Sequence, residues 1–230
     1  MRIAMSASGH ITTVRHSPQN PQNSRTRLLH ARLLIPLGVA ISMVGYFGPW
    51  VNHRVAGLVI LGLDLGEVVK FLEPIRNGQM GLWRQGFYLP LLVMSLGLSL
   101  YVFRPALRYN WPTRLVLLGI AAVAALNMLP PAWDPPRLRT PEFRLQTIWI
   151  GLCLSAALIS PLLALIPQRL AALLITLLAI PAIWLPVRNF LRVLPTLSEL
   201  YNQTLTPGWG MYVMGIGLIV LLLGVWRAER

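Results

Sequence analysis

The chain has 230 residues, of which 55% are hydrophobic and only 12% are charged, and its mean hydropathy is +0.61. A soluble globular domain carries about 25% charged residues, so this chain has too few charges to cover a surface that faces water. Its apolar residues are grouped in long runs, which is typical of segments that face a lipid bilayer. The composition therefore excludes an ordinary soluble domain and predicts an all-α polytopic membrane protein.

The charged residues are unevenly balanced, with 20 Lys and Arg against 7 Asp and Glu. The Arg residues flank the apolar runs, where cations act as topology signals and contact anionic headgroups. We find no basic stripe interleaved with aromatic residues, so we expect the lipid bilayer as a partner and no nucleic acid. The single cysteine, Cys153, lies inside an apolar run, which rules out an intrachain disulfide.

Residues 1–27 are polar, contain Ser, Asn, Pro and Arg, and include no acid. Such a segment cannot bury a core, so we predict a disordered basic tail followed by a transmembrane domain over residues 28–230. The composition also fits an organelle transit peptide. A basic cytoplasmic tail on a bacterial membrane protein is the favoured interpretation.

Six apolar runs follow the tail, each of about 17 to 22 residues, which is enough to cross roughly 30 Å of hydrocarbon. They cover residues 33–51, 87–103, 115–133, 145–166, 170–187 and 210–226. Between the fourth and fifth runs, Pro167 predicts a tight helical hairpin because proline halts the preceding helix. Prolines inside the runs predict kinks or, as an alternative, the broken helices of a transporter site; they are Pro90, Pro161 and Pro181.

The orientation is predicted from the cations at the two ends of the domain. Arg25, Arg27 and Arg32 precede the first run, and Arg227 and Arg230 follow the last. By the positive-inside rule, both termini are expected in the cytoplasm, with the protein in the bacterial inner membrane. Tryptophans near the run ends fit interfacial anchors on the outer side; these are Trp50, Trp83, Trp133, Trp149, Trp184 and Trp209.

Two outer loops, residues 52–86 and 188–209, are long enough to contain structure of their own. In the first, Val55–Leu63 predicts a strand or an interfacial segment, and the pair Asp64 and Glu67 predicts the start of a short helix. In the second, we predict a short interfacial helix over residues 196–203.

The segments Phe47-Gly48-Pro49-Trp50-Val51 and Gly62-Leu63-Asp64-Leu65-Gly66 stand at the start of the first outer loop. Together they resemble segments of small multi-pass bacterial membrane proteins over about 20 residues. The resemblance implies a bacterial source and carries no activity with it.

Small residues recur at packing intervals in three runs. They are Gly38, Ser42 and Gly45; Gly151 and Ser155; and Gly210, Gly217 and Gly224, which are seven apart. Such stripes let helix backbones approach closely where no hydrophobic force acts between helices. We favour packing inside the bundle over association with another membrane protein subunit, although both remain open.

Ionisable residues are missing from the middle of all six runs, which argues against an ion-coupled transporter because such proteins keep charged groups in the membrane for function. Asn127 is the largest polar group within a run. An interhelical hydrogen bond is favoured over a substrate contact for it. The three cations Arg137, Arg139 and Arg144 of an outer loop are candidate contacts for lipid headgroups or, as the favoured alternative, belong to a solvated loop.

We find no nucleotide-binding, zinc-hydrolase or serine-hydrolase motif, and the four histidines lack metal spacing. We therefore predict no catalytic, cofactor-binding or metal-binding residues. The expected function is a non-enzymatic accessory or scaffold subunit of a membrane assembly. The alternatives are a permease-type subunit with an apolar path for lipid-like molecules and an outer-leaflet enzyme acting on lipid-linked substrates.

Overall fold

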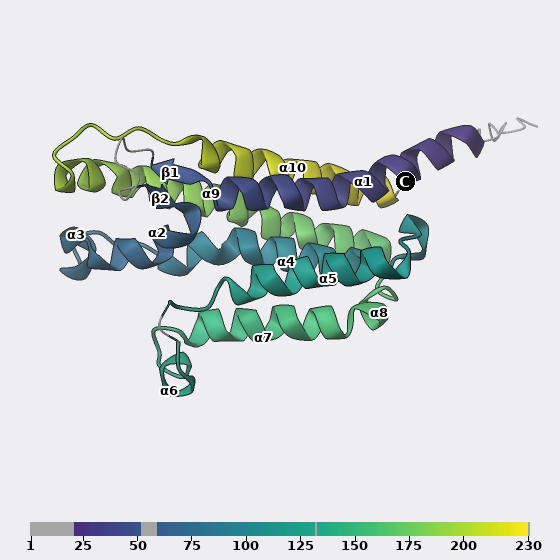
Figure 1. The fold of residues 1–230 in the computed structure, drawn as a ribbon, viewed down its shortest axis with the longest axis horizontal. Helices are drawn as coiled ribbons and strands as arrows, with labels where there is room; N and C mark the ends of the chain where they lie inside the picture. The colour runs from purple at the N-terminus through teal and green to yellow at the C-terminus, as the bar shows by residue number, and fades with distance from the viewer. Residues whose placement is uncertain (1–20, 52–58, 132, 230) are drawn as a thin grey trace, which may run out of the picture.

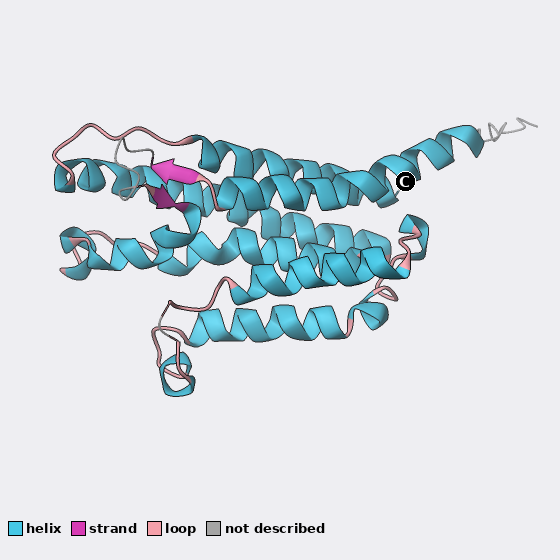
Figure 2. Cartoon of the chain, viewed as in Figure 1, coloured by secondary structure: helices cyan, strands magenta, loops and turns pink. Residues whose placement is uncertain are grey.

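The computed structural model describes residues 21–51, 59–131 and 133–229, and this part of the chain is mostly helical (Figure 2). Six long helices run along a common axis and alternate in direction (Figure 1). They are α1 (Pro21–Tyr46), α4 (Leu89–Tyr101), α5 (Trp111–Leu126), α7 (Arg144–Leu158), α9 (Gln168–Leu200) and α10 (Trp209–Glu229). The expectation of a helical fold is confirmed for these residues.

Short elements join the long helices at the two ends of the bundle. One end, here called the loop end, carries β1 (Pro49–Val51), β2 (Ile60–Leu61), α2 (Gly62–Val68), η2 (Val69–Phe71), α3 (Glu73–Arg76), η3 (Arg84–Tyr88) and α6 (Pro135–Leu138). The opposite end, here called the terminal end, carries η4 (Pro105–Leu107) and α8 (Ser160–Leu163), and α1 begins and α10 ends there (Figure 1). The strands β1 and β2 pair antiparallel.

The expectation of about six bilayer-length helices is not supported. Within the described residues, only α9 and α10 are long and apolar enough to cross a membrane. The helices α4, α5 and α7 have 13, 16 and 15 residues, which at about 1.5 Å per residue leaves them short of the roughly 30 Å hydrocarbon core. The apolar runs predicted helices that are too long, because apolar residues continue past the end of each helix into the turn that follows.

The ends of several runs are corrected in the same way. The first helix ends at Tyr46 rather than residue 51, because Pro49–Val51 forms β1. It begins at Pro21, so residues 21–27 belong to α1, while residues 1–20 of the expected tail lie outside the described residues. The third run ends at Leu126 instead of residue 133, and the fourth breaks at Ile159, one residue before the α8 turn that contains Pro161.

Helix α9 differs most from its prediction, since it continues for 33 residues through Pro181, Pro186 and Pro195. The predicted end at residue 187 and the separate helix over 196–203 are both wrong. Contacts at the loop end explain the continuation. Phe190 is buried with its ring centroid 5.6 Å from that of Trp50, and the Asn189 amide donates to the Trp83 carbonyl at 3.1 Å. Tertiary packing overrides the local preference of proline.

At the loop end, α2 begins at Gly62, two residues before the predicted start at Asp64. The Asp64 carboxylate still serves the helix start, because it accepts from the Leu61 backbone N–H at 3.1 Å. Of the segment Val55–Leu63, residues 55–58 lie outside the described residues, and Ile60–Leu61 forms a strand. Trp50, expected at the interface, is fully buried.

Helix α4 occupies the centre of the bundle. All 13 of its residues are buried, and it contacts α1, α5, α7, α8, α9 and α10. A helix that is apolar on every side needs protein or lipid on every side, and here the other helices supply it. The axis of the bundle is therefore filled by a helix.

Helices α1 and α10 form the tightest helix pair through the predicted small residues. A Cβ placed on Gly38 would lie 2.3 Å from the Leu221 nitrogen, and one on Gly217 would lie 2.3 Å from the Ser42 nitrogen. The same applies to Gly45, Gly210 and Gly224, each of which would meet an atom of the partner helix within 3.0 Å. The Ser42 hydroxyl donates to the Met214 carbonyl at 3.2 Å. These stripes let the two backbones touch.

The stripe of Gly151 and Ser155 in α7 does not meet another described helix. Gly151 and Ser155 lie on the exposed face of α7, and a Cβ on Gly151 would meet no described atom within 4 Å. The buried face of α7 is formed instead by Ile150, Cys153 and Ala156.

Candidate ligand-binding cleft

A cleft of about 640 Å³ opens at the loop end between α2, the end of α5 and the end of α9. Apolar side chains from residues 59–68 form one wall, and residues 126–131 form the other. Polar and aromatic groups complete the described lining: Asp64, Glu67, Asn127, Tyr88, Trp133 and Tyr201.

The sequence of α2 explains why the acids of the cleft lie together. Asp64 and Glu67 are three residues apart and Val68 is one further, so the three side chains share one helical face. The glycines lie with Leu65 on the buried side of α2 and let aromatic rings pack against the helix there. A Cβ on Gly66 would lie 2.6 Å from the Tyr88 ring, and one on Gly62 would lie 2.6 Å from the Trp50 indole nitrogen. The spacing Gly62-x-x-x-Gly66 is thus a packing requirement.

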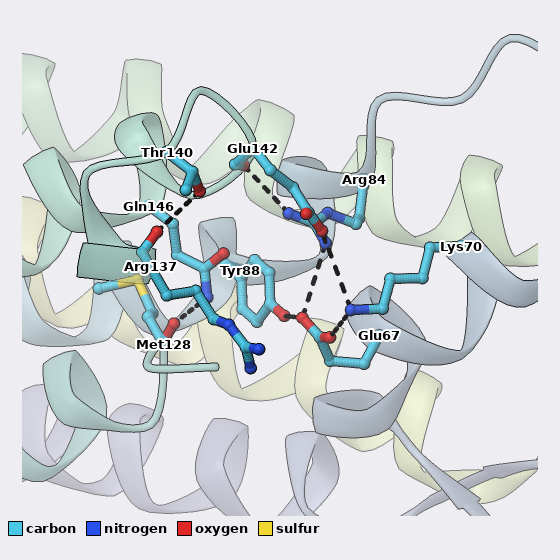
Figure 3. A network of polar contacts seen from close by, with 9 residues as sticks. All are labelled: Glu67, Lys70, Arg84, Tyr88, Met128, Arg137, Thr140, Glu142 and Gln146. Atoms are coloured by element: carbon cyan, nitrogen blue, oxygen red, sulfur yellow. Dashed lines mark hydrogen bonds and ion pairs between the residues drawn. The ribbon is translucent and has the colours of Figure 1, made fainter. Parts of the chain in front are cut away.

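Glu67 stands at the centre of a polar network beside the cleft (Figure 3). One carboxylate oxygen accepts from the Tyr88 hydroxyl at 3.1 Å, and the other lies 2.5 Å from the Lys70 Nζ. Arg84 lies 3.7 Å from Glu67 and 2.8 Å from Glu142. The network therefore ties α2, η3 and the segment before α7 to one another.

Burial makes this network stronger than surface ion pairs. The Arg84 and Glu67 side chains are only 11% and 17% exposed, so solvent and salt screen their attraction weakly. Phe143 closes the other side, with its ring centroid 5.1 Å from the Arg84 guanidinium and 5.7 Å from the Lys70 ammonium. Arg84 is paired mainly with Glu142 and Lys70 mainly with Glu67, and neither cation is part of the described cleft lining.

Tyr88 links the network to the bundle. Burial raises the pKa of its hydroxyl, and the nearby negative charge of Glu67 raises that pKa further. The hydroxyl therefore stays protonated and acts as a donor to Glu67. Gln146 lies beside the Tyr88 ring in Figure 3, and its amide donates to the Met128 carbonyl just after the end of α5.

The arrangement suits binding better than bond-making chemistry. Both oxygens of Glu67 are engaged, and Tyr88 is held neutral, so neither group is poised as a base. Within the described residues, no cluster of three His, Cys, Asp or Glu side chains has the geometry to hold a metal ion. An apolar cleft with a few convergent polar groups is typical of ligand sites.

The residues proposed from sequence fall in different places. Arg137, Arg139 and Arg144 are exposed around α6 and the start of α7, outside the described lining of the cleft. The interhelical hydrogen bond expected for Asn127 is not what the structure shows: its amide donates to the Val123 carbonyl of the same helix at 2.8 Å. Asn127 also lines the cleft.

Sequence reasoning missed the aromatic members of the cleft. Tyr88 was counted within an apolar run, Trp133 as an interfacial anchor, and Tyr201 was not singled out. The only available signal was the pair Asp64 and Glu67 followed by Lys70 at helical spacing. That pattern predicts a local ion pair and says nothing about α5 or α9.

Comparison of the chain with protein-family models, curated proteins and solved structures finds no match. The function therefore has to be inferred from the residues of the chain itself.

Proposed function

We propose that the chain is a non-enzymatic subunit of a bacterial inner membrane, embedded through its helical bundle and presenting the cleft on the outer side. The observation that carries the proposal is a belt of large apolar side chains exposed on five helices. Leu158 is 82% exposed and Leu177 is 66% exposed. Further members are Leu33, Leu37, Val44, Val116, Val123, Ile148, Leu152, Leu173, Ile180, Ile216, Ile219 and Leu223.

Soluble monomers rarely expose contiguous apolar patches of more than about 300 to 600 Å², whereas large apolar side chains are exposed here on five helices. The members of this belt lie on the outward faces of α1, α5, α7, α9 and α10, around the central α4. Contact of this surface with lipid chains costs no free energy, whereas its exposure to water is unfavourable.

The short helices α4, α5 and α7 are compatible with this placement. Helix α4 is enclosed by protein and has no need to match the bilayer. Around α5 and α7, local thinning of the bilayer and the apolar turns that follow each helix would compensate for their length.

The orientation with both termini in the cytoplasm rests on the cations beside the first and last helices and on the acids, since the described loop end also carries the cations Lys70, Arg76, Arg84, Arg137, Arg139, Arg144, Arg188 and Arg192. The terminal end carries the cations Arg32, Arg104, Arg108, Arg114, Arg169 and Arg227. Six of the chain's seven acids belong to the loop end: Asp64, Glu67, Glu73, Asp134, Glu142 and Glu199. Cation-rich segments remain on the cytoplasmic side of bacterial membranes.

Two features favour an accessory or scaffold role over the alternatives. A permease path along the bundle axis would require α4 to move out of its fully packed position. An outer-leaflet enzyme would need an acid or nucleophile held ready as a base, whereas Glu67 is engaged by Tyr88 and Lys70 and Asp64 serves the start of α2 through the Leu61 N–H. A rigid bundle with a pre-formed cleft is suited to holding a ligand or a partner in place.

The placement is tested by single cysteines in a Cys153→Ala background, labelled with an impermeant maleimide on intact cells. We expect labelling of Arg137→Cys at the loop end, and labelling of Arg108→Cys at the terminal end only after lysis. The reverse pattern would overturn the orientation. Release of the protein from membranes by alkaline carbonate would overturn the embedding itself.

A further inference from the structure

The charge of the cleft is opposite to that of the chain. The chain has 20 Lys and Arg against 7 Asp and Glu, yet the described lining contains two carboxylates, Asp64 and Glu67, and no Lys or Arg. Two cations of the network, Lys70 and Arg84, are held by Glu67, Glu142 and Phe143. A cleft that presents acids in such a basic protein selects for a positive ligand.

The aromatic residues of the cleft favour the same kind of ligand. Tyr88, Trp133 and Tyr201 come from η3, the segment before α6 and the end of α9, and converge on one lining. The Trp133 ring is 57% exposed, so one face is accessible at the rim. Aromatic faces beside carboxylates are the usual recognition site for alkylated ammonium groups.

The apolar wall shows that the ligand also carries a hydrophobic part. Leu126, Leu129 and Pro130 form this wall at the end of α5. Leu126 is 46% exposed and also borders the outer face of α5, which belongs to the apolar belt. A molecule partitioned in the outer part of the bilayer can therefore reach the cleft without first entering water.

We propose that the cleft binds the ammonium group of an amphipathic organic cation, with its apolar chain against the end of α5. This inference rests on the proposed membrane placement. Asp64 is the main anchor, because Lys70 and Arg84 offset the charge of Glu67, while Asp64 accepts from the Leu61 N–H with one oxygen and offers the ligand the other, which accepts no hydrogen bond from the described residues. Trp133 covers the ammonium from the rim.

Two kinds of ligand carry such an ammonium group, an aminophospholipid through its headgroup and a water-soluble amphipathic amine. Calorimetric titration of the full chain with octyltrimethylammonium, in uncharged maltoside micelles and corrected with empty micelles, measures the shared chemistry. Octyl sulfate serves as the anion of equal chain length. The source is identified by adding phosphatidylethanolamine to the micelles, with phosphatidylglycerol as the control. If only the ethanolamine lipid competes with octyltrimethylammonium, the ligand is a lipid headgroup. If neither lipid competes, the ligand is a soluble amine.

The variant Asp64→Asn removes the charge but keeps an oxygen for the Leu61 N–H. We expect it to weaken octyltrimethylammonium binding about tenfold. Trp133→Leu should weaken binding by roughly threefold, as expected for an exposed cation–π contact. The control Glu73→Gln removes an acid at the same end, outside the described lining, and should leave the affinity unchanged.

Equal binding of octyl sulfate, or unchanged affinity in Asp64→Asn, would overturn the ammonium site. An equal loss in Glu73→Gln would also overturn it, since it would point to the general charge of the loop end. A melting curve of each variant tests whether that variant is folded. Because these titrations are done in micelles, their failure is distinct from failure of the membrane placement, which is tested by carbonate extraction and cysteine labelling.

Discussion

The small-residue stripes of α1 and α10 and the stripe of α7 are alike in sequence but have different surroundings. In the first pair, Gly38, Ser42 and Gly217 lie against the backbone of the opposite helix. In α7, Gly151 and Ser155 are exposed, and no described atom approaches the Cβ position of Gly151 within 4 Å. The same spacing thus appears once as a closed interface and once as an open face.

The difference teaches that a small-residue stripe permits close approach but does not specify a neighbour. Helices α1 and α10 carry complementary stripes, so each groove receives the other backbone. Helix α7 lies at the edge of the bundle, and its larger residues Ile150 and Cys153 face the other helices. Three pairs of substitutions test this comparison.

The largest effect is expected from Gly217→Leu. A Cβ at this position would lie 2.3 Å from the Ser42 nitrogen and 2.7 Å from the Gly38 carbonyl oxygen, and backbone atoms cannot rotate away as a side chain can. We expect the free energy of unfolding to fall by about 3 kcal/mol, the upper range for overpacking. The melting temperature of the purified monomer in detergent measures the change.

Gly151→Leu is the matched control, because it places the same side chain on the open stripe of α7. Its melting temperature should stay close to that of the parent protein. Equal losses in the two variants would show that the comparison is wrong, since both stripes would then be packed in the folded monomer.

The sequence located these stripes because their spacing depends only on helical geometry. Each of the six apolar runs also contains all or part of one of the long helices, although the runs over 33–51 and 145–166 contain β1 and α8 as well. The sequence did not locate the ends of these helices. Helices end at Leu126 and Leu158 within apolar runs, and Pro195 lies inside α9, because contacts between segments distant in the chain decide where each helix stops.

The cleft shows the same limit more strongly. Asp64 and Glu67 were recognised as the start of a short helix, and that local feature is present, two residues earlier than predicted. The partners Tyr88 and Tyr201 come from segments about 20 and more than 130 residues away in the chain, and a local pattern carries no information about such pairings.

A smaller effect is expected from Ser42→Ala, which tests the polar part of the closed interface. The Ser42 hydroxyl is buried and donates to the Met214 carbonyl at 3.2 Å across the helix pair. Its removal should lower the free energy of unfolding by about 1 kcal/mol, the usual net value of such a bond. Ser155→Ala on the open stripe is the control, and an equal effect there would contradict the contrast between the two faces.

The smallest effect, and the one with the opposite sign, is expected from Gly151→Ala. Glycine in the middle of a helix costs about 0.5 to 1 kcal/mol relative to alanine, because it loses more backbone freedom on folding. Since a Cβ on Gly151 would meet no described atom within 4 Å, alanine should recover this cost and raise the melting temperature of the monomer slightly. Gly217→Ala, in contrast, should lower it, because its Cβ would overlap the Ser42 backbone.

A fall in the melting temperature for Gly151→Ala in the monomer would mean that another part of the chain covers the α7 stripe. A rise in the monomer combined with loss of a co-purifying subunit would mean that a partner helix covers it.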